Sequence, residues 1–460
     1  VKIDRKVIRI GKKVADLVML SKQKNTSQLG FYSSFEEQLS HSHPLYKLAH
    51  EIEWKTFDDS FAKHYSTKMG KPAKPIRLMV SLLILKQLRN LSDESIVEQW
   101  SENVYYQYFS GELYFAPKLP CVPTELVEFR KRIGPEGVEL IFKESIRVNG
   151  KDAEDDHLSA DTTIQEKNIT YPTDDKLYKK IIDECRSIAA DEGVELRRSY
   201  TQTIKKLSTI QRFKKNKNGY AKSRKAGKKI KTIAGVLVRE LHRKLPAERL
   251  NVHSQDLALF SKVLAQQKTD SNKTYSFHEP HVKCYTKGKE HKKFEFGSKV
   301  SILVTQTTGV IVGALNFSGT EHDSKTLTTA IDQYERLTNR KAKSVFADRG
   351  YRGTSQINET KIYVPKPDKN ITRQKRKRHG RRAAIEPVIG HLKQHYRMGR
   401  NYLKGIIGDE INVLLAAAAM NFKRRINLWR SEANFCWKLI YQMIINVYWT
   451  FFAQKPKYTF

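Results

Sequence analysis

The hydrophobic positions in the first third of the chain repeat with the period of a helix. One apolar stripe, spaced by three and four residues, is formed by Leu78, Leu82, Leu85 and Leu88. A second helix can begin at Ser92 or Asp93, and residues 123–146 carry another helical pattern with basic residues along its edge. We therefore expect a helical N-terminal domain over about residues 1–150. Basic helices suit DNA binding, but the pattern alone favours a plain helical scaffold.

The period changes to two at His157, where apolar and polar residues alternate as they do in a strand. Further strand patterns occur at 294–304, 309–317, 344–347 and 361–365, of which the first two read as a hairpin. Helical patterns fill the intervals, at 174–268, 322–337, 380–400 and 409–430. This order predicts an α+β or α/β fold in which helices flank a mixed sheet, with a helical insertion at about 174–268.

The charge of the chain indicates a polyanionic partner. The 460 residues include 84 Lys and Arg against 49 Asp and Glu, a net charge of +35. A hydrophobic content of 39% is too high for a disordered basic tail protein. The predicted insertion is the most basic part, with 16 Lys and Arg and two acids between Thr201 and Leu250. We expect a folded protein that binds nucleic acid or an acidic membrane surface. Runs of charge are usually solvated faces, but the density of charge in this insertion would also grip phosphates.

The sequence favours a reducing cytoplasm over a membrane or an oxidising compartment. The apolar stretch at 435–452 is interrupted by Lys438, Gln442 and Asn446, so we expect a buried terminal helix rather than a membrane span. The first 13 residues alternate apolar and basic positions, and we expect no signal peptide there. Four scattered cysteines without a close pair are typical of reduced thiols.

Three carboxylates stand out in this basic chain because they occur in apolar or cationic surroundings. Asp161 lies within the first strand, Asp348 follows the strand at 344–347, and Glu386 lies in a helix crowded with cations. Taken singly, such an acid is more often a salt-bridged surface residue. Brought together, three carboxylates would repel one another unless they held cations, and oxygen ligands suit Mg²⁺ or Mn²⁺. Two such ions about 4 Å apart are the usual device for phosphodiester cleavage.

Two competing local signals are weaker. A stretch with metal-ligand residue types contains His278, His281, Cys284 and His291, but it reads as extended and lacks the tight pairs of a zinc site. Gly350 and Gly353 lack the spacing and the Lys-Ser/Thr of a phosphate-binding loop, which argues against a nucleotide-driven motor.

At the three carboxylates the sequence resembles the bacterial insertion-sequence transposases of the DDE class. Asp161 in SADTT, Asp348 in FADRGYRG and Glu386 in RRAAIEPVIGHLK match the three acids of that class. The spacing Arg382-x3-Glu386-x6-Lys393 matches a Tyr-Arg-Glu-Lys signature, in which His379 stands at the Tyr position. Residues 76–111 resemble the N-terminal helical domain of these proteins, and 277–302 and 319–327 resemble their middle region, so the likeness covers about residues 30–430.

The resemblance implies an RNase-H-like catalytic domain, here over about 157–405, with C-terminal helices at 406–460. It implies that Asp161, Asp348 and Glu386 are catalytic ligands of two Mg²⁺ or Mn²⁺ ions. It further implies that the substrates are double-stranded DNA, namely terminal inverted repeats and target DNA, and that the helical domain at about 1–150 binds the repeats. It also implies that Arg382 and Lys393 contact DNA near the scissile phosphate, which suits the chemistry of both side chains. Further DNA contacts are expected from the neighbouring cations and ring, namely Arg349, Arg376, Arg378, His379 and Arg381.

Three functions remain open. The first is a transposase that cuts and joins DNA, for which pairing of two ends makes a homodimer or a larger assembly the default. The second is a nuclease with the same core that cuts without joining. The third is a DNA-binding relic of a transposase without enzymatic activity, although the presence of all three carboxylates counts against it.

Overall fold

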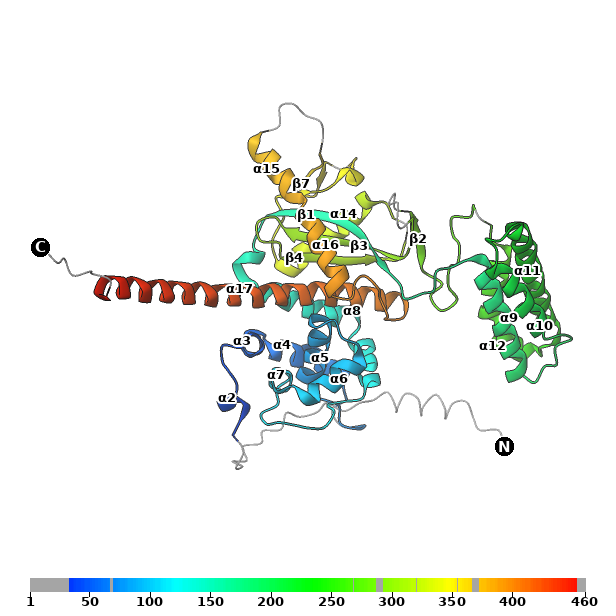
Figure 1. The fold of residues 1–460 in the computed structure, drawn as a ribbon, viewed down its shortest axis with the longest axis horizontal. Helices are drawn as coiled ribbons and strands as arrows, with labels where there is room; N and C mark the ends of the chain where they lie inside the picture. Colours follow the sequence, from blue (N-terminus) through cyan, green and yellow to red (C-terminus); the bar gives the residue numbers. More distant parts are fainter. Residues whose placement is uncertain are drawn as a thin grey trace, which may run out of the picture.

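The computed structural model describes residues 33–452 apart from 67–68, 268, 287–292, 320, 354 and 366–371. At Lys375 and over 433–452 only the backbone is described, Met443 excepted. The expectation for the first 13 residues therefore lies outside the described part. Figure 1 shows three regions: helices from the N-terminal third on one side of a long helix, a sheet on its other side, and a separate helical bundle beyond the sheet.

The N-terminal region is helical, as the sequence predicts. Its α-helices are α2 Phe35–Gln38, α3 Pro44–Glu51, α4 Trp54–Phe61, α5 Ile76–Leu88, α6 Asp93–Glu102, α7 Val104–Phe109 and α8 Pro123–Val148, with 3-10 turns η1 Ala62–His64 and η2 Gly150–Ala153. Ser92 caps α6, because its side chain accepts the N–H of Ser95. The prediction of a single apolar stripe on α5 is wrong, since the helix is buried on almost every side. Within α8, Gly134 with φ 62° precedes Pro135 and breaks the helix into two arms.

The sheet has the strand order and directions of an RNase-H-like core. Its strands are β1 His157–Glu166, β2 Lys283–Thr286, β3 Phe294–Thr305, β4 Ile311–Phe317, β5 Ser344–Phe346, β6 Gln356–Ile357 and β7 Thr360–Tyr363. β3 runs antiparallel to both β1 and β4, whereas β5 is parallel to β1 and β7 is parallel to β5. The strand order is β4-β3-β1-β5-β7. Of the two remaining strands, β2 pairs with β3 and β6 pairs with β7. The predicted mixed sheet with flanking helices is confirmed.

The helices after β4 differ from the predicted ones in their boundaries. α14 Asp323–Thr338 covers the predicted 322–337, but the single helix expected over 380–400 is two helices, α15 Arg373–Arg382 and α16 Ile385–His395. Pro387 causes the break, because its nitrogen cannot donate to the carbonyl of residue 383 and its ring would clash there. The last helix, α17 Gly405–Phe452, has 48 residues and is much longer than the predicted 409–430.

α17 joins the N-terminal helices to the sheet. It packs against α5, α8 and β4, so both regions share one hydrophobic core. Within the described residues, the segment Gly405–Glu432 is long and apolar enough to span a membrane by length and composition, and 72% of its most apolar window is buried inside the protein. The predicted helix at 435–452 is part of α17, while the burial of its side chains lies outside the description.

The insertion between β1 and β2 is a helical bundle, as predicted. It comprises α9 Asp174–Asp191, α10 Thr201–Arg212, α11 Gly219–Lys244, α12 Ala247–Val252 and α13 Ser254–Ala265. Thr173 caps α9 by accepting the N–H of Lys176. The bundle has its own hydrophobic core, formed largely by aliphatic residues of α9, α11 and α13. It stands apart from the sheet (Figure 1).

Candidate active site

The three acids singled out in the sequence come from elements that meet at one end of the sheet. β1 and β5 are parallel with Ser159 aligned to Phe346, so Asp161 and Asp348 both lie two residues beyond that pair in the same direction. α16 packs against β1 and carries Glu386 in its first turn. The charges of Asp348 and Glu386 both act on Asp161. The fold thus gathers residues that are separated by more than 200 positions in the sequence.

Arg382 lies between two of these carboxylates. Its Nη1 is 3.8 Å from Asp161 Oδ2, and its Nη2 is 3.3 Å from Glu386 Oε1. The side chain is largely buried, and Nη1 has no hydrogen-bond partner among the described residues. A buried guanidinium with an unused donor beside two carboxylates is able to donate to a further oxyanion.

Asp161 is the acid whose ionisation the site perturbs most. Burial raises its pKa to about 6, and the negative charges of Asp348 and Glu386 act in the same direction. The N–H of Thr162, 2.8 Å from Oδ1, and the charge of Arg382 oppose this rise. The second acid is held by the turn after β5, since Asp348 Oδ1 accepts the N–H of Gly350 at 2.8 Å.

A fourth carboxylate, Asp323 at the start of α14, lies beside the site and was missed in the sequence. Its Oδ1 accepts from Thr162 Oγ1 at 3.0 Å and from Lys299 Nζ at 2.8 Å. A Cβ on Gly350 would lie 3.0 Å from a carboxylate oxygen of both Asp323 and Asp348, so a larger residue there would press on both side chains. The sequence gives no reason to single out Asp323, because an acid in the first turn of a helix is ordinarily explained by its favourable interaction with the helix dipole.

Tyr351 completes the inner wall of the site. Its side chain is fully buried. Burial and the charges of Asp323, Asp161 and Asp348 all raise its pKa, so it stays a neutral phenol at the pH of a cell. The three aspartates are therefore grouped around one buried ring.

The carboxylates of the site are suitable ligands for a divalent metal ion, but they are not yet close enough together to bind one. Carboxylate oxygens are the ligands that Mg²⁺ and Mn²⁺ prefer. Burial and the charges of the neighbouring carboxylates raise the pKa of Asp161, so a cation bound there would favour its ionised form. Yet among the described residues no three His, Cys, Asp or Glu side chains stand close enough to hold one ion. Glu386, with its side chain 65% exposed, is the ligand with most freedom to move inward.

The residues predicted to contact DNA fall into two groups. Arg349, Arg376 and Arg381 are exposed around the carboxylates and on α15, and Lys393 follows Glu386 by two helical turns on the same face of α16. The second group lies against the sheet, away from the carboxylates. The ring of His379 packs edge-on against Phe346, and Arg378 lines a pocket with His157, at the start of β1.

One residue of the stretch considered for zinc, His281, belongs to a structural network. His281 Nε2 is 3.1 Å from Asp409 Oδ2, and Asp409 Oδ1 is 2.7 Å from Lys167 Nζ. Lys167 and Asp409 are both buried, so this network fixes the start of α17 to the end of β1. His291 lies outside the described residues, and no metal-holding group occurs within them.

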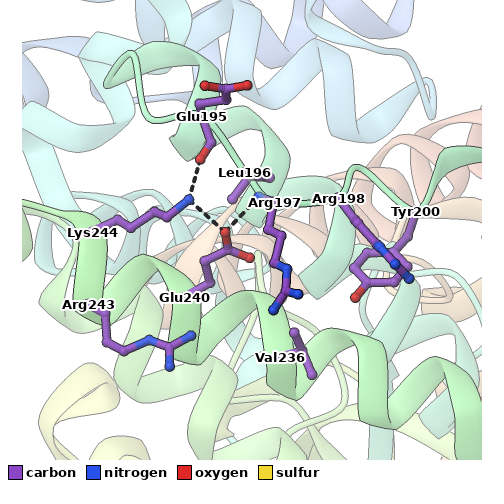
Figure 2. A pocket seen from close by; sticks show the side chains of 9 residues that line it. All are labelled: Glu195, Leu196, Arg197, Arg198, Tyr200, Val236, Glu240, Arg243 and Lys244. Atoms are coloured by element: carbon purple, nitrogen blue, oxygen red, sulfur yellow. Dashed lines mark hydrogen bonds and ion pairs between the residues drawn. The ribbon is translucent and has the colours of Figure 1, made fainter.

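The insertion carries a basic pocket of its own. Its volume is about 790 Å³, and it is formed by the α9–α10 loop and α11 (Figure 2). At its centre the buried Glu240 accepts the backbone N–H of Arg197 at 2.7 Å and pairs with Lys244 Nζ at 2.9 Å. The side chains of Arg197 and Arg243 lie near this pair, and Arg198 lies farther out in the pocket (Figure 2). The pocket belongs to the insertion, which stands apart from the sheet that carries Asp161 (Figure 1).

Replacing Asp161 by Asn is expected to stabilise the metal-free protein at neutral pH. The amide still accepts the Thr162 N–H and removes a charge that burial disfavours. Because the pKa of about 6 in the folded protein exceeds the ordinary 3.8, the folded protein holds this proton more tightly than the unfolded chain. The favourable contribution of protonated Asp161 to the free energy of unfolding is complete below about pH 4 and is lost as pH rises through about 6.

Denaturant unfolding in EDTA at pH 4 and pH 8 checks this expectation. At pH 8 the Asp161→Asn variant should exceed the wild type by roughly 1–3 kcal/mol in free energy of unfolding, and the difference should vanish near pH 4. Glu359→Gln, at an exposed carboxylate paired with Lys341, is the control and should change stability by less than about 0.5 kcal/mol at both pH values. A lower stability of Asp161→Asn at pH 8 would show that the acid is not destabilised by its surroundings.

Comparisons with known proteins point to one class. A transposase domain family, DUF772, matches residues 33–132, and the transposase DDE domain family matches residues 267–422. The second match includes Asp348 and Glu386 and begins after Asp161. The chain is also 38% identical over 169 residues to the uncharacterized protein ORF8 of the nfe locus of Rhizobium meliloti, an alignment that spans 36% of this chain and 81% of the relative. No solved structure matches the chain.

Proposed function

Because the chain belongs to the insertion-sequence transposases of the DDE class, we propose that it binds the terminal inverted repeats of its element, cuts them and joins them to target DNA. The observation that carries the proposal is the meeting of Asp161, Asp348 and Glu386 at one end of an RNase-H-like sheet, with Arg382 between two of them. The reaction takes place in the bacterial cytoplasm, where the DNA is.

In the proposed reaction one site catalyses two displacements at phosphorus. Water attacks the phosphodiester at the end of the element, the bond to the 3′ oxygen breaks, and a 3′-hydroxyl is freed. That hydroxyl then attacks a phosphodiester of the target, forming a new bond to the element and releasing a target 3′-hydroxyl. No carboxylate becomes a nucleophile in either step.

Asp161, Asp348 and Glu386 would hold Mg²⁺ or Mn²⁺. Bound there, the metal would polarise the phosphate, activate the attacking oxygen and stabilise the leaving one. The turn at Gly350 fixes Asp348, and Thr162 fixes Asp161, so two of the ligands are held by the backbone before DNA arrives. Glu386 would join them from α16.

The cations around the carboxylates would hold the DNA. Arg382, released from Asp161 and Glu386, would donate to the oxygens of the scissile phosphate, and Lys393 would add a point charge on the same face of α16. Exposed cations of α15 and the basic insertion would bind the flanking backbone. We assign repeat binding to the helices of about residues 1–150, and catalysis to about 157–405. Two copies of the chain would pair the two ends.

Replacing Arg382 by Gln is expected to lower the rate of cleavage at saturating DNA by about 10²–10³-fold, the usual loss when a donor to a developing oxyanion is removed. Single-turnover cleavage with Mg²⁺ measures the rate, and salt titration of binding measures the contact with phosphates. The control is Arg381→Gln, since Arg381 is an exposed neighbour on the same helix. This variant should reduce the slope of log affinity against log salt by the amount expected for about one lost phosphate contact. It should leave the cleavage rate nearly unchanged. Equal effects of both variants on the rate would contradict the assignment.

A strand-transfer assay separates the three candidate functions. The purified protein is incubated with Mg²⁺, a target plasmid and a labelled duplex that carries the end flanking its own gene. A transposase gives cuts at the end boundary followed by label joined to the plasmid. A nuclease gives the cuts without joined product, and a relic gives salt-sensitive binding without either.

A further inference from the structure

A second basic surface lies where the N-terminal helices meet the catalytic region. It is a cleft of about 970 Å³ between the end of α5, the β3–β4 turn, α16 and α17. Its lining includes Arg89, His391, His395, Lys423 and Arg424 and contains no Asp or Glu. We call it the junction cleft. The pocket of the insertion, in contrast, has the acids Glu195 and Glu240 among its cations.

The positive charge of the junction cleft is not balanced within the fold. Arg424 is committed, since it binds Asp152 and the carbonyl of Thr308, both at 2.9 Å. Arg89 and Lys423, the other two strong cations, have no carboxylate or carbonyl partner for their side chains among the described residues. Burial and the charges of Arg430 and Arg89 lower the pKa of Lys423, and no carboxylate opposes them. An anion in the cleft would relieve this repulsion.

One helix separates the junction cleft from the carboxylates. On α16, Glu386 and Lys393 lie seven residues apart on one face, whereas His391 and His395 lie four apart on another face and line the cleft. The two histidine rings are stacked with centroids 5.5 Å apart, which gives the cleft a flat wall. An α-helix with its side chains is about 10–12 Å wide, close to the width of about 12 Å of a DNA major groove.

We propose that the junction cleft binds the sugar-phosphate backbone of the same DNA end that reaches the carboxylates. With α16 along the major groove, one strand would pass Glu386 while phosphates of the other strand would enter the cleft beside Arg89 and Lys423. The cleft would thereby fix the rotation of the duplex between the N-terminal helices and the catalytic site. The choice of DNA rests on the proposed function, whereas the anion site rests on the unbalanced cations alone.

The test measures binding of the end duplex separately from its cleavage. The double variant Arg89→Gln with Lys423→Gln removes both unpaired cations. Each lost phosphate contact flattens the plot of log affinity against log salt by about 0.9, so the slope should fall by roughly 1.8. The loss of affinity relative to the wild type should then be about tenfold larger at 50 mM than at 200 mM salt. The cleavage rate at saturating DNA should stay within about threefold, because neither side chain reaches the scissile phosphate.

A second variant guards against a folding effect of changing the half-buried Lys423. Asn427→Glu places a negative charge at an exposed position of the lining and should weaken binding in the same salt-dependent way. Lys131→Gln and Lys341→Gln remove exposed cations that are already paired with Glu128 and Glu359, and they should leave the slope within about 0.3 of the wild type.

The possible outcomes separate the two proposals. A reduced slope in both cleft variants, with unchanged controls, supports the junction cleft as a backbone site even if the wild type never cuts. A wild type that cuts and joins DNA while the cleft variants keep its slope overturns the cleft and leaves the proposed function standing. A wild type that does not bind the duplex overturns both.

Discussion

Replacing Asp348 by Ala is expected to abolish DNA cleavage and to leave DNA binding intact. Asp348 is fixed by the turn after β5 and its charge acts on Asp161, so its loss removes one of the carboxylates that would hold the metal ion. Removal of one electrostatic contributor to a transition state costs about 10²–10³-fold in rate, and loss of a metal ligand should exceed this. The DNA contacts come from other side chains and remain.

Cleavage of the end duplex with Mg²⁺ and a mobility shift in EDTA measure the two properties on one preparation. Glu359→Ala is the matched control, because it removes an exposed carboxylate of the same sheet region that has no place in the site. It should cut at the wild-type rate. Cleavage by Asp348→Ala within tenfold of the wild type would mean that the metal-binding acids have been misassigned.

The largest change in stability is expected from Asp93→Ala, in the N-terminal helices. Asp93 Oδ1 is 2.8 Å from Lys86 Nζ, and both of its oxygens accept hydrogen bonds from Arg130, at 2.8 and 2.7 Å. Burial by itself would raise the pKa of Asp93, but the hydrogen bonds from Arg130 and the charge of Lys86 outweigh it and hold the pKa at about 2. Burial lowers the pKa of Lys86 to about 8. Two buried cations thus depend on one carboxylate.

Loss of that carboxylate should cost about 3–5 kcal/mol in free energy of unfolding at pH 7, because two charges are left buried without a partner. Denaturant unfolding measures it. On α8 the exposed Glu128, paired with Lys131, provides the control Glu128→Ala, which should change stability by less than about 1 kcal/mol. Replacing all three buried partners by apolar residues of similar volume should recover most of the loss. A cost below about 1 kcal/mol for Asp93→Ala would show that solvent screens the triad.

Much of the fold could be predicted from periodicity because each element buries one regular face. The strand at His157, the hairpin and the helical insertion follow from patterns of two and of three to four residues. The errors occur where burial or a single residue overrides the pattern. α5 is buried on almost every side because it lies inside the core, and the break before α16 precedes Pro387, which cannot continue a helix from α15. The length of α17 follows from its packing against two regions at once.

The candidate site was accessible from sequence only in part. Asp161, Asp348 and Glu386 stand out because acids are rare in their surroundings, and the fold brings them together. Asp323 and Tyr351 could not be found in this way, since a helix-start acid and a buried tyrosine are common in any domain. The pair of Arg382 with Glu386 has the i,i+4 spacing of helix neighbours, whereas the contact of Arg382 with Asp161 joins positions more than 200 residues apart and needs the tertiary fold.

The measurement that tests the central claim most directly is metal-directed cleavage of the protein backbone. Fe²⁺ replaces Mg²⁺, and ascorbate with peroxide generates radicals that cut the chain next to the bound ion. If Asp161, Asp348 and Glu386 hold the metal, the cuts should fall near these three positions, fade in excess Mg²⁺ and disappear in Asp348→Ala. Cuts elsewhere in the chain, or cuts near these positions that survive both excess Mg²⁺ and the loss of Asp348, would contradict the claim.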